Sequence, residues 1–200
     1  LEIKSVSYKG GNLSKRWRYS DGREGGNMHT DGVERPPELT PKYFGFAVIN
    51  MSRKGGKLLL VSVAQVYLRL QKSAPNLLEV LRNGFYFSLK GDKIGGKEYT
   101  KKPIIFKTGE KFGFDYIGAQ YLRTYIHQGH ELAGKPLTPI QLEALDAFDQ
   151  ELENPDNVFV SDYLKGGFYV FNNHRALHGR TAYKDARGDR KRELLRVWVV

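Results

Sequence analysis

The segment from residue 168 to residue 200 reads FYVFNNHRALHGRTAYKDARGDRKRELLRVWVV, and the rest of the chain is interpreted around it. An apolar run over residues 168–171 leads to two histidines, His174 and His178. A polar loop that contains a glycine follows over residues 184–191. Apolar runs that stop at polar, glycine-bearing segments are typical of strands joined by loops.

A second apolar run, over residues 194–200, begins beside Arg192 and contains Arg196. Together with the first run it predicts a hairpin: strand, polar connection, strand. Such a hairpin would present a histidine on one strand and a guanidinium on the neighbouring strand to the same cavity.

The composition is ordinary for a soluble globular protein of one domain, because 40% of the 200 residues are hydrophobic and 27% are charged. No apolar run approaches the roughly 20 residues of a membrane span, so we expect no membrane partner, and a cytoplasmic location is the default. Since the chain has no cysteine, any bound metal must be held by imidazole and carboxylate groups. Oligomeric state is not predicted.

The formal net charge of +10 allows an acidic small molecule or a nucleic acid as the partner. The lysines and arginines are scattered along the chain, whereas a nucleic-acid binder usually concentrates them on one face. A solvated basic surface is therefore the favoured interpretation, and nucleic acid is not the expected partner.

Short apolar and alternating segments predict a mainly β chain with helices inserted in mid-sequence, as in a sandwich or barrel. Thr138-Pro139 opens the clearest helix, with threonine as N-cap and proline at the first helical position. The predicted strands are residues 1–8, 43–50, 57–63, 85–89, 103–106, 112–116 and 158–163, and the predicted helices are residues 63–70, 76–81 and 138–153.

His29 and Asp31 lie two residues apart, so on a strand both side chains would point to one face and could reach one ion. Taken alone, this spacing is common by chance, and an ordinary pair of surface residues in a glycine-flanked loop is the competing interpretation. Two histidines and one carboxylate form the facial triad of non-haem Fe(II) oxygenases.

The run NNHRALHGRTAY at residues 172–183, RELLRVW at 192–198 and HTD at 29–31 resemble the taurine dioxygenase and clavaminate synthase-like superfamily. The glycine pair at 55–56 and KGG at 165–167 also fall where that family has them. The resemblance implies a double-stranded β-helix (jelly-roll) core with flanking helices. It also implies a single domain over residues 1–200 whose amino-terminal part is short or truncated.

The resemblance implies that His29, Asp31 and His178 hold the metal, with no catalytic residue beyond these ligands. His174 competes for the distal position on composition alone, and the family pattern assigns it a packed or hydrogen-bonded role instead. His127 and His130 fit no ligand position, and a surface or loop location suffices for both.

Arg192 follows His178 by fourteen residues, where such enzymes place the arginine that binds the distal carboxylate of 2-oxoglutarate. A guanidinium suits this role because it stays charged and binds a carboxylate bidentately. Arg196 is expected on the same strand face as a substrate-binding residue, and Arg180 and Arg175 are further candidates. Leu58 stands where relatives commonly carry a hydroxyl for the cosubstrate, and Ser62 is a candidate replacement.

The implied activity is that of an Fe(II)-dependent dioxygenase with 2-oxoglutarate as cosubstrate and molecular oxygen as oxidant. It would hydroxylate, or otherwise oxidise at an unactivated C–H bond, a small molecule such as a carboxylate or an amino-acid-like compound. Two alternatives stay open: an oxygenase that acts on protein or nucleic acid, and a non-catalytic basic β-barrel that only binds.

Overall fold

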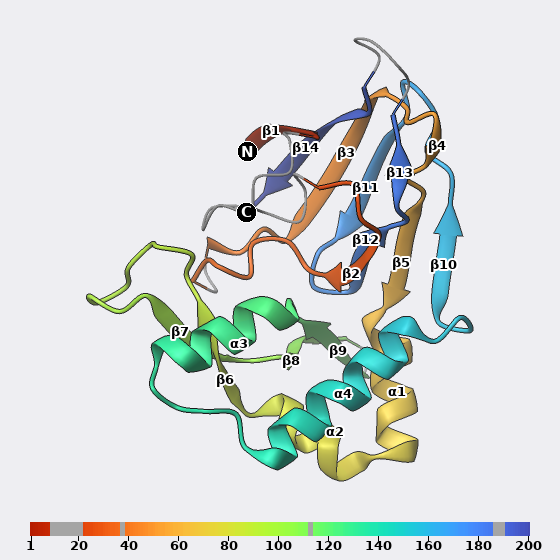
Figure 1. The fold of residues 1–200 in the computed structure, drawn as a ribbon. Coiled ribbons are helices and arrows are strands. Elements are labelled where there is room, and N and C mark those ends of the chain that lie inside the picture. The colour runs from red at the N-terminus through yellow and green to blue at the C-terminus, as the bar shows by residue number, and fades with distance from the viewer. Residues whose placement is uncertain (9–21, 37–38, 112–113, 186–190) are drawn as a thin grey trace.

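Two antiparallel sheets face each other and enclose a core of aromatic and aliphatic side chains (Figure 1). The structure is a computed structural model that describes residues 1–8, 22–36, 39–111, 114–185 and 191–200. The first sheet has the order β1 (Glu2–Ser7), β14 (Glu193–Val199), β3 (Tyr43–Asn50) and β11 (Phe168–Asn172). The second has the order β10 (Val158–Ser161), β5 (Leu58–Ser62), β12 (Ala176–Arg180) and β2 (Gly26–His29).

Alternation along the strands builds the core between the sheets. On β3, Phe44, Phe46 and Val48 are buried, because successive side chains of a strand point to opposite faces. They pack with Leu58 from the opposite sheet and with residues of β14. Two four-stranded antiparallel sheets arranged in this way are typical of a jelly roll.

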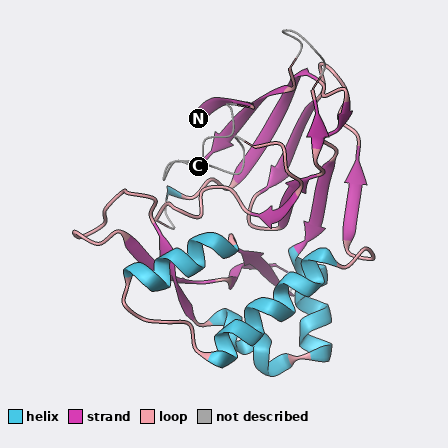
Figure 2. Ribbon diagram, in the orientation of Figure 1, coloured by secondary structure: helices cyan, strands magenta, loops and turns pink. Residues whose placement is uncertain are grey.

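The helices and two hairpins lie together at one end of the two sheets (Figure 2). Their apolar faces form a second core that includes Phe85, Ile126 and Phe148. The N-cap threonine of the last helix makes the full capping box with Gln141. These elements are α1 (Val63–Ser73), α2 (Pro75–Arg82), β6 (Gly84–Ser88), β7 (Tyr99–Pro103), β8 (Ile105–Lys111), β9 (Phe114–Ala119), α3 (Arg123–Leu132) and α4 (Pro139–Glu153), and β4 (Lys54–Gly55) pairs with β13 (Tyr183–Lys184).

The predicted carboxy-terminal hairpin is wrong. β11 and β14 are not neighbours, because β3 lies between them in the first sheet. Between them the chain crosses to the second sheet, where β12 pairs with β2 and β5. Hydrophobic alternation identifies a strand but does not name its partner, since any antiparallel neighbour satisfies the same pattern. The loop predicted over residues 184–191 lies partly outside the described residues.

Helix α3 was missed, and the strands around residue 104 were misplaced. The α3 N-cap, Leu122, makes no side-chain capping bond, so the sequence carries no start signal there. The strand predicted over residues 103–106 is in fact the junction of β7 and β8. The lysines at positions 101 and 102 hide β7 in the sequence, because lysine is depleted in strands. No helix in the described part of the chain is long and apolar enough to cross a membrane.

Candidate metal and anion site

The pair His29 and Asp31 lies where β2 ends. β2 stops at His29, and Asp31 occupies the turn that follows, so the two do not share one continuous strand as predicted. The turn is fixed on both sides: Thr30 N donates to Tyr121 O and Tyr121 N donates to Thr30 Oγ1, both at 3.0 Å. Asn173 Oδ1 accepts from Asp31 N at 2.8 Å, and its Nδ2 donates to Asp31 O at 2.9 Å. The backbone around Asp31 is therefore held in one place.

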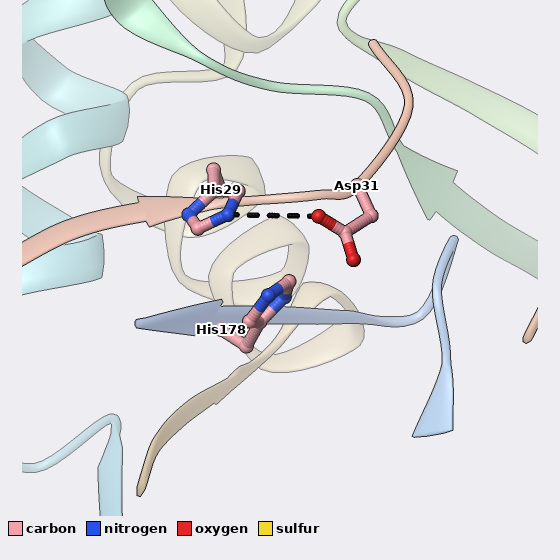
Figure 3. A group of neighbouring side chains, drawn as sticks. All are labelled: His29, Asp31 and His178. Atoms are coloured by element: carbon pink, nitrogen blue, oxygen red, sulfur yellow. Dashed lines mark ion pairs between the residues drawn. The ribbon is translucent and has the colours of Figure 1, made fainter. Parts of the chain in front are cut away.

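His178 lies directly opposite His29 because β12 pairs with β2 in that register. The two imidazole ring centroids are 4.3 Å apart. One possible ligand atom from each of His29, Asp31 and His178 lies within 4.8 Å of the others (Figure 3). Among the described residues, no other cluster of three such side chains has this spacing.

The protonation states of His178 and Asp31, and the hydrogen bonds around His29, suit a divalent metal. Burial, with repulsion from His29, lowers the pKa of His178 to about 3, and its Nδ1 has no hydrogen-bond partner. His29 Nδ1 lies 2.7 Å from Asn27 O, which leaves Nε2 facing Asp31 Oδ1 at 3.8 Å. Burial raises the pKa of Asp31, but Arg196 and its other neighbours outweigh burial and lower it overall. The uncharged imidazole of His178 and the ionised carboxylate of Asp31, with the ring of His29 beside them, fit Fe(II).

Two residues of β14 hold the carboxylate of Asp31. Arg196 Nη1 donates to Oδ1 at 3.1 Å, and Trp198 Nε1 donates to Oδ2 at 2.7 Å. The strand that begins directly after Arg192 therefore also orients Asp31. Arg196 and Trp198 are two residues apart on β14, so both side chains point to the same face, toward the second sheet.

Arg192 is a buried cation, 4% exposed. Its guanidinium lies 5.7 Å from the ring centre of Tyr163 and 5.2 Å from that of Tyr183. It packs against Gly56, where φ is +72° and a Cβ would lie 3.1 Å from Arg192 Nε. Its backbone N donates to Asp185, but among the described residues no hydrogen-bond acceptor contacts its guanidinium. A buried charge of this kind is stabilised when an anion binds beside it.

Two small cavities open at these residues, each about 50 Å³. The first is lined by three cations, Arg180, Arg192 and Arg196, and by Tyr163, beside the side chains of His29, Asp31 and His178. The second shares His29, Asp31 and Arg196 with the first and adds Glu34, Leu122, Tyr125 and Trp198.

The remaining histidines lie outside the group. His174 packs edge-on against Phe106, with ring centroids 5.4 Å apart, which agrees with its predicted packed role. His127 is exposed on α3 and accepts from Arg123 Nε at 3.0 Å. For His130 the predicted surface or loop location is wrong. It is 4% exposed on α3. Tyr86 N donates to its Nε2 at 3.2 Å, and its Nδ1 donates to Lys135 O at 2.7 Å, so both ring nitrogens have partners inside the protein.

Two of the weaker candidates also lie away from the cavities. Arg175 is exposed and stacks on Tyr116, 4.7 Å from its ring centre. Ser62 is exposed at the α1 end of β5, where it pairs with Ala176. Arg192 packs at the other end of that strand, beside Gly56, so the Ser62 hydroxyl does not reach the first cavity. Leu58 is buried in the core between the sheets.

Arg180 lines the first cavity. Its guanidinium donates to the backbone oxygens of Gly22, at 2.7 Å, and Glu24. It therefore ties the segment that precedes β2 to β12.

Sequence reasoning missed three residues that shape this site: Asn173, Tyr163 and Trp198. Asn173 is fully buried and bonds the backbone of both Asp31 and Pro41. Its position beside His174 gave no sign of this, because asparagine is equally common in exposed turns. Trp198 lies two residues after Arg196 on a predicted strand, so its side chain is expected on the same face as that of Arg196. This spacing was a usable signal for its place in the site.

Lys102, on β7, supports the turn after Asp31 by hydrogen bonds to its backbone. It is 4% exposed, and its Nζ donates to Val33 O at 2.8 Å and Arg35 O at 3.2 Å. Burial lowers its pKa to about 7, against the opposing effect of Glu34. The pKa of a lysine in the unfolded chain is about 10.4. Between these values the unfolded chain binds more protons, so this group makes the free energy of unfolding rise with pH.

We therefore expect the wild type to gain stability relative to Lys102→Met as the pH rises from about 7 to about 10, by at most roughly 1.4 kcal/mol per pH unit. Urea denaturation at several pH values measures this difference. Lys101→Met, which changes the exposed neighbour on β7, is the matched control and should show no such slope. A difference for Lys102→Met that stays constant over this range would contradict the prediction.

The chain is similar to known proteins in sequence and in fold. Residues 5–198 match the model of the family described as taurine catabolism dioxygenase TauD, TfdA family. The FR-33289 synthase of Streptomyces rubellomurinus is 25% identical over 163 residues, which are 80% of this chain and 47% of that protein. This chain thus spans about half the length of that curated relative.

Solved structures share the fold. An asparagine oxygenase, determined with Fe(II), 3-hydroxyasparagine and succinate, superposes with a TM-score of 0.74 at 15% identity, over 99% of this chain and 56% of that one. A taurine dioxygenase from Burkholderia xenovorans superposes with a TM-score of 0.63 at 19% identity, over 100% and 64%. At such low identity the likeness establishes the fold alone. The predicted jelly-roll fold and the family resemblance are both confirmed.

Proposed function

The chain belongs to the taurine catabolism dioxygenase TauD, TfdA family, and from this premise we propose that it is an Fe(II)- and 2-oxoglutarate-dependent dioxygenase acting on a small molecule. One observation carries the proposal. The His29, Asp31 and His178 group opens onto a cavity that also contains the buried guanidinium of Arg192. A metal site and an anion site in one cavity are what a cosubstrate with a keto-acid end and a distal carboxylate requires.

His29, Asp31 and His178 would hold the iron. When bound, Fe(II) supplies the redox chemistry with 2-oxoglutarate and molecular oxygen. The chain's own residues orient the side chains that would hold the iron and shield the site. Asn27 fixes the ring of His29 by accepting from its Nδ1, and the stacking of Phe44 on His178, with centroids 4.2 Å apart, restricts the second ring. Arg192 would bind the distal carboxylate.

The hydroxyl contact that Leu58 cannot make is assigned to Tyr163. Its side chain is 5% exposed and lines the same cavity as Arg192. Burial raises the pKa of its hydroxyl, so the group stays protonated and can donate to an anion at neutral pH.

Arg196 would contact the substrate, because it lines both cavities. A guanidinium in that position favours a carboxylate, as in an amino acid or a related small acid. The asparagine oxygenase complex, which contains 3-hydroxyasparagine, supports a substrate of this class.

The test is anaerobic addition of Fe(II) and 2-oxoglutarate, followed by exposure to air with amino acids and small acids in turn. We expect the absorption band of the chelated cosubstrate in the first step. In the second step we expect succinate, read by mass spectrometry, to form faster with one class of compound. His178→Ala is the control. No band and no iron-dependent succinate would overturn the proposal.

A further inference from the structure

Both oxygens of the Asp31 carboxylate accept hydrogen bonds from β14. Trp198 Nε1 donates to Oδ2 at 2.7 Å, and Arg196 Nη1 donates to Oδ1 at 3.1 Å. The side chains of Asp31 and Arg196 are only 4% and 12% exposed, so water screens their attraction weakly. Oδ1 is also the oxygen that lies 3.8 Å from His29 Nε2. It is therefore the oxygen that faces the other two side chains of the metal group.

Trp198 is fixed in turn by cations. The guanidinium of Arg196 lies 4.1 Å from its ring centre, and that of Arg35 lies 4.5 Å from it. The indole is 3% exposed, and guanidinium groups are attracted to its π face. The ring cannot turn without losing these contacts, so its N–H keeps hold of Oδ2.

A metal ion at this group and Arg196 would need the same oxygen. With Oδ2 held by Trp198, Oδ1 is the atom left for the metal, and Arg196 already donates to it. A second cation near a buried guanidinium is repelled by it, and at short range in a partly desolvated site this repulsion is considerable.

We propose that Arg196 competes with the metal for Asp31 Oδ1 while Trp198 positions the carboxylate through Oδ2, so that an anion bound beside Arg196 strengthens metal binding. This inference rests on the proposed metal site. Arg196 lines both cavities, so a carboxylate in either one can draw the guanidinium away from Asp31. By linkage, the metal then strengthens anion binding by the same factor.

The test is a calorimetric titration of the full chain with Zn(II), which measures the affinity for the metal. Zn(II) is used because it is redox-inert and accepts imidazole and carboxylate ligands. We expect Arg196→Gln to bind Zn(II) more tightly than the wild type, by about five- to a hundredfold, the usual range of such coupling. Trp198→Phe keeps the ring but loses the N–H, and should bind about ten- to a hundredfold more weakly, as other supporting residues of metal sites do. Arg192→Gln removes a guanidinium that does not touch Asp31, and should change the affinity less than Arg196→Gln.

Acetate provides the anion. It should strengthen Zn(II) binding in the wild type but not in Arg196→Gln, whereas acetate that ligates Zn(II) directly would act equally on both. Weaker Zn(II) binding by Arg196→Gln, or an equal acetate effect in the two proteins, overturns the inference. The metal site is judged separately: if His178→Ala binds Zn(II) as tightly as the wild type, the proposed function fails together with the inference.

Discussion

His178→Ala is expected to lose metal binding by more than about a hundredfold and to lose turnover completely. Changes to supporting residues of a metal site already cost about ten- to a hundredfold, and this change removes a ligand. The register of β12 against β2 brings the imidazole opposite His29, and no other histidine in the described part of the chain can replace it. His29→Ala and Asp31→Ala should behave in the same way.

His174→Ala is the matched control, because it removes a neighbouring histidine that contacts Phe106 and lies outside the metal group. It should keep the absorption band of Fe(II) with 2-oxoglutarate. If His174→Ala loses that band while His178→Ala keeps it, the distal ligand is wrongly assigned.

Arg192→Ala is expected to raise the apparent KM for 2-oxoglutarate by a hundredfold to a few thousandfold. Removing one partner of a buried ion pair typically costs about 3–5 kcal/mol, and each roughly 1.4 kcal/mol is a factor of ten in affinity. The guanidinium is buried beside Tyr163 and Tyr183, so water does not readily take its place. Arg192→Lys should not restore binding, since an ammonium lacks the bidentate fork.

Arg196→Ala is the comparison for this prediction. It should act mainly on the substrate, through a higher KM for it or through succinate formed without product. The measurement is the apparent KM for 2-oxoglutarate at saturating iron in both variants. If Arg196→Ala carries the large increase and Arg192→Ala almost none, the roles of the two arginines are reversed.

Local patterns predicted much of this molecule. Apolar runs on either side of a glycine turn located β3 and β5, and the threonine and proline before α4 marked the start of that helix. The three side chains of the metal group were found by their resemblance to a family motif, and the structure brings them within 4.8 Å. Their role as ligands stays a prediction.

What the sequence did not predict depends on long-range packing. The spacing of Arg192 and Arg196 placed both on one inward face, but not the bond from Arg196 to Asp31. That contact exists because β14 and the turn after β2 meet across the core. Lys102 could not be recognised as buried either, since it follows another lysine in a hydrophilic stretch, and only the packing of β7 against the turn at Val33 covers it.

The position of β14 also has a consequence for how the protein is synthesised. β14 lies between β1 and β3 and pairs with both along most of its length, although it follows them late in the chain. Within the described residues β1 pairs only with β14, so while the chain emerges from the ribosome β1 waits for that partner and β3 keeps one open edge. Open edges with apolar side chains readily pair with other chains. Nascent chains that stall before β14 should therefore aggregate more readily than chains that contain it.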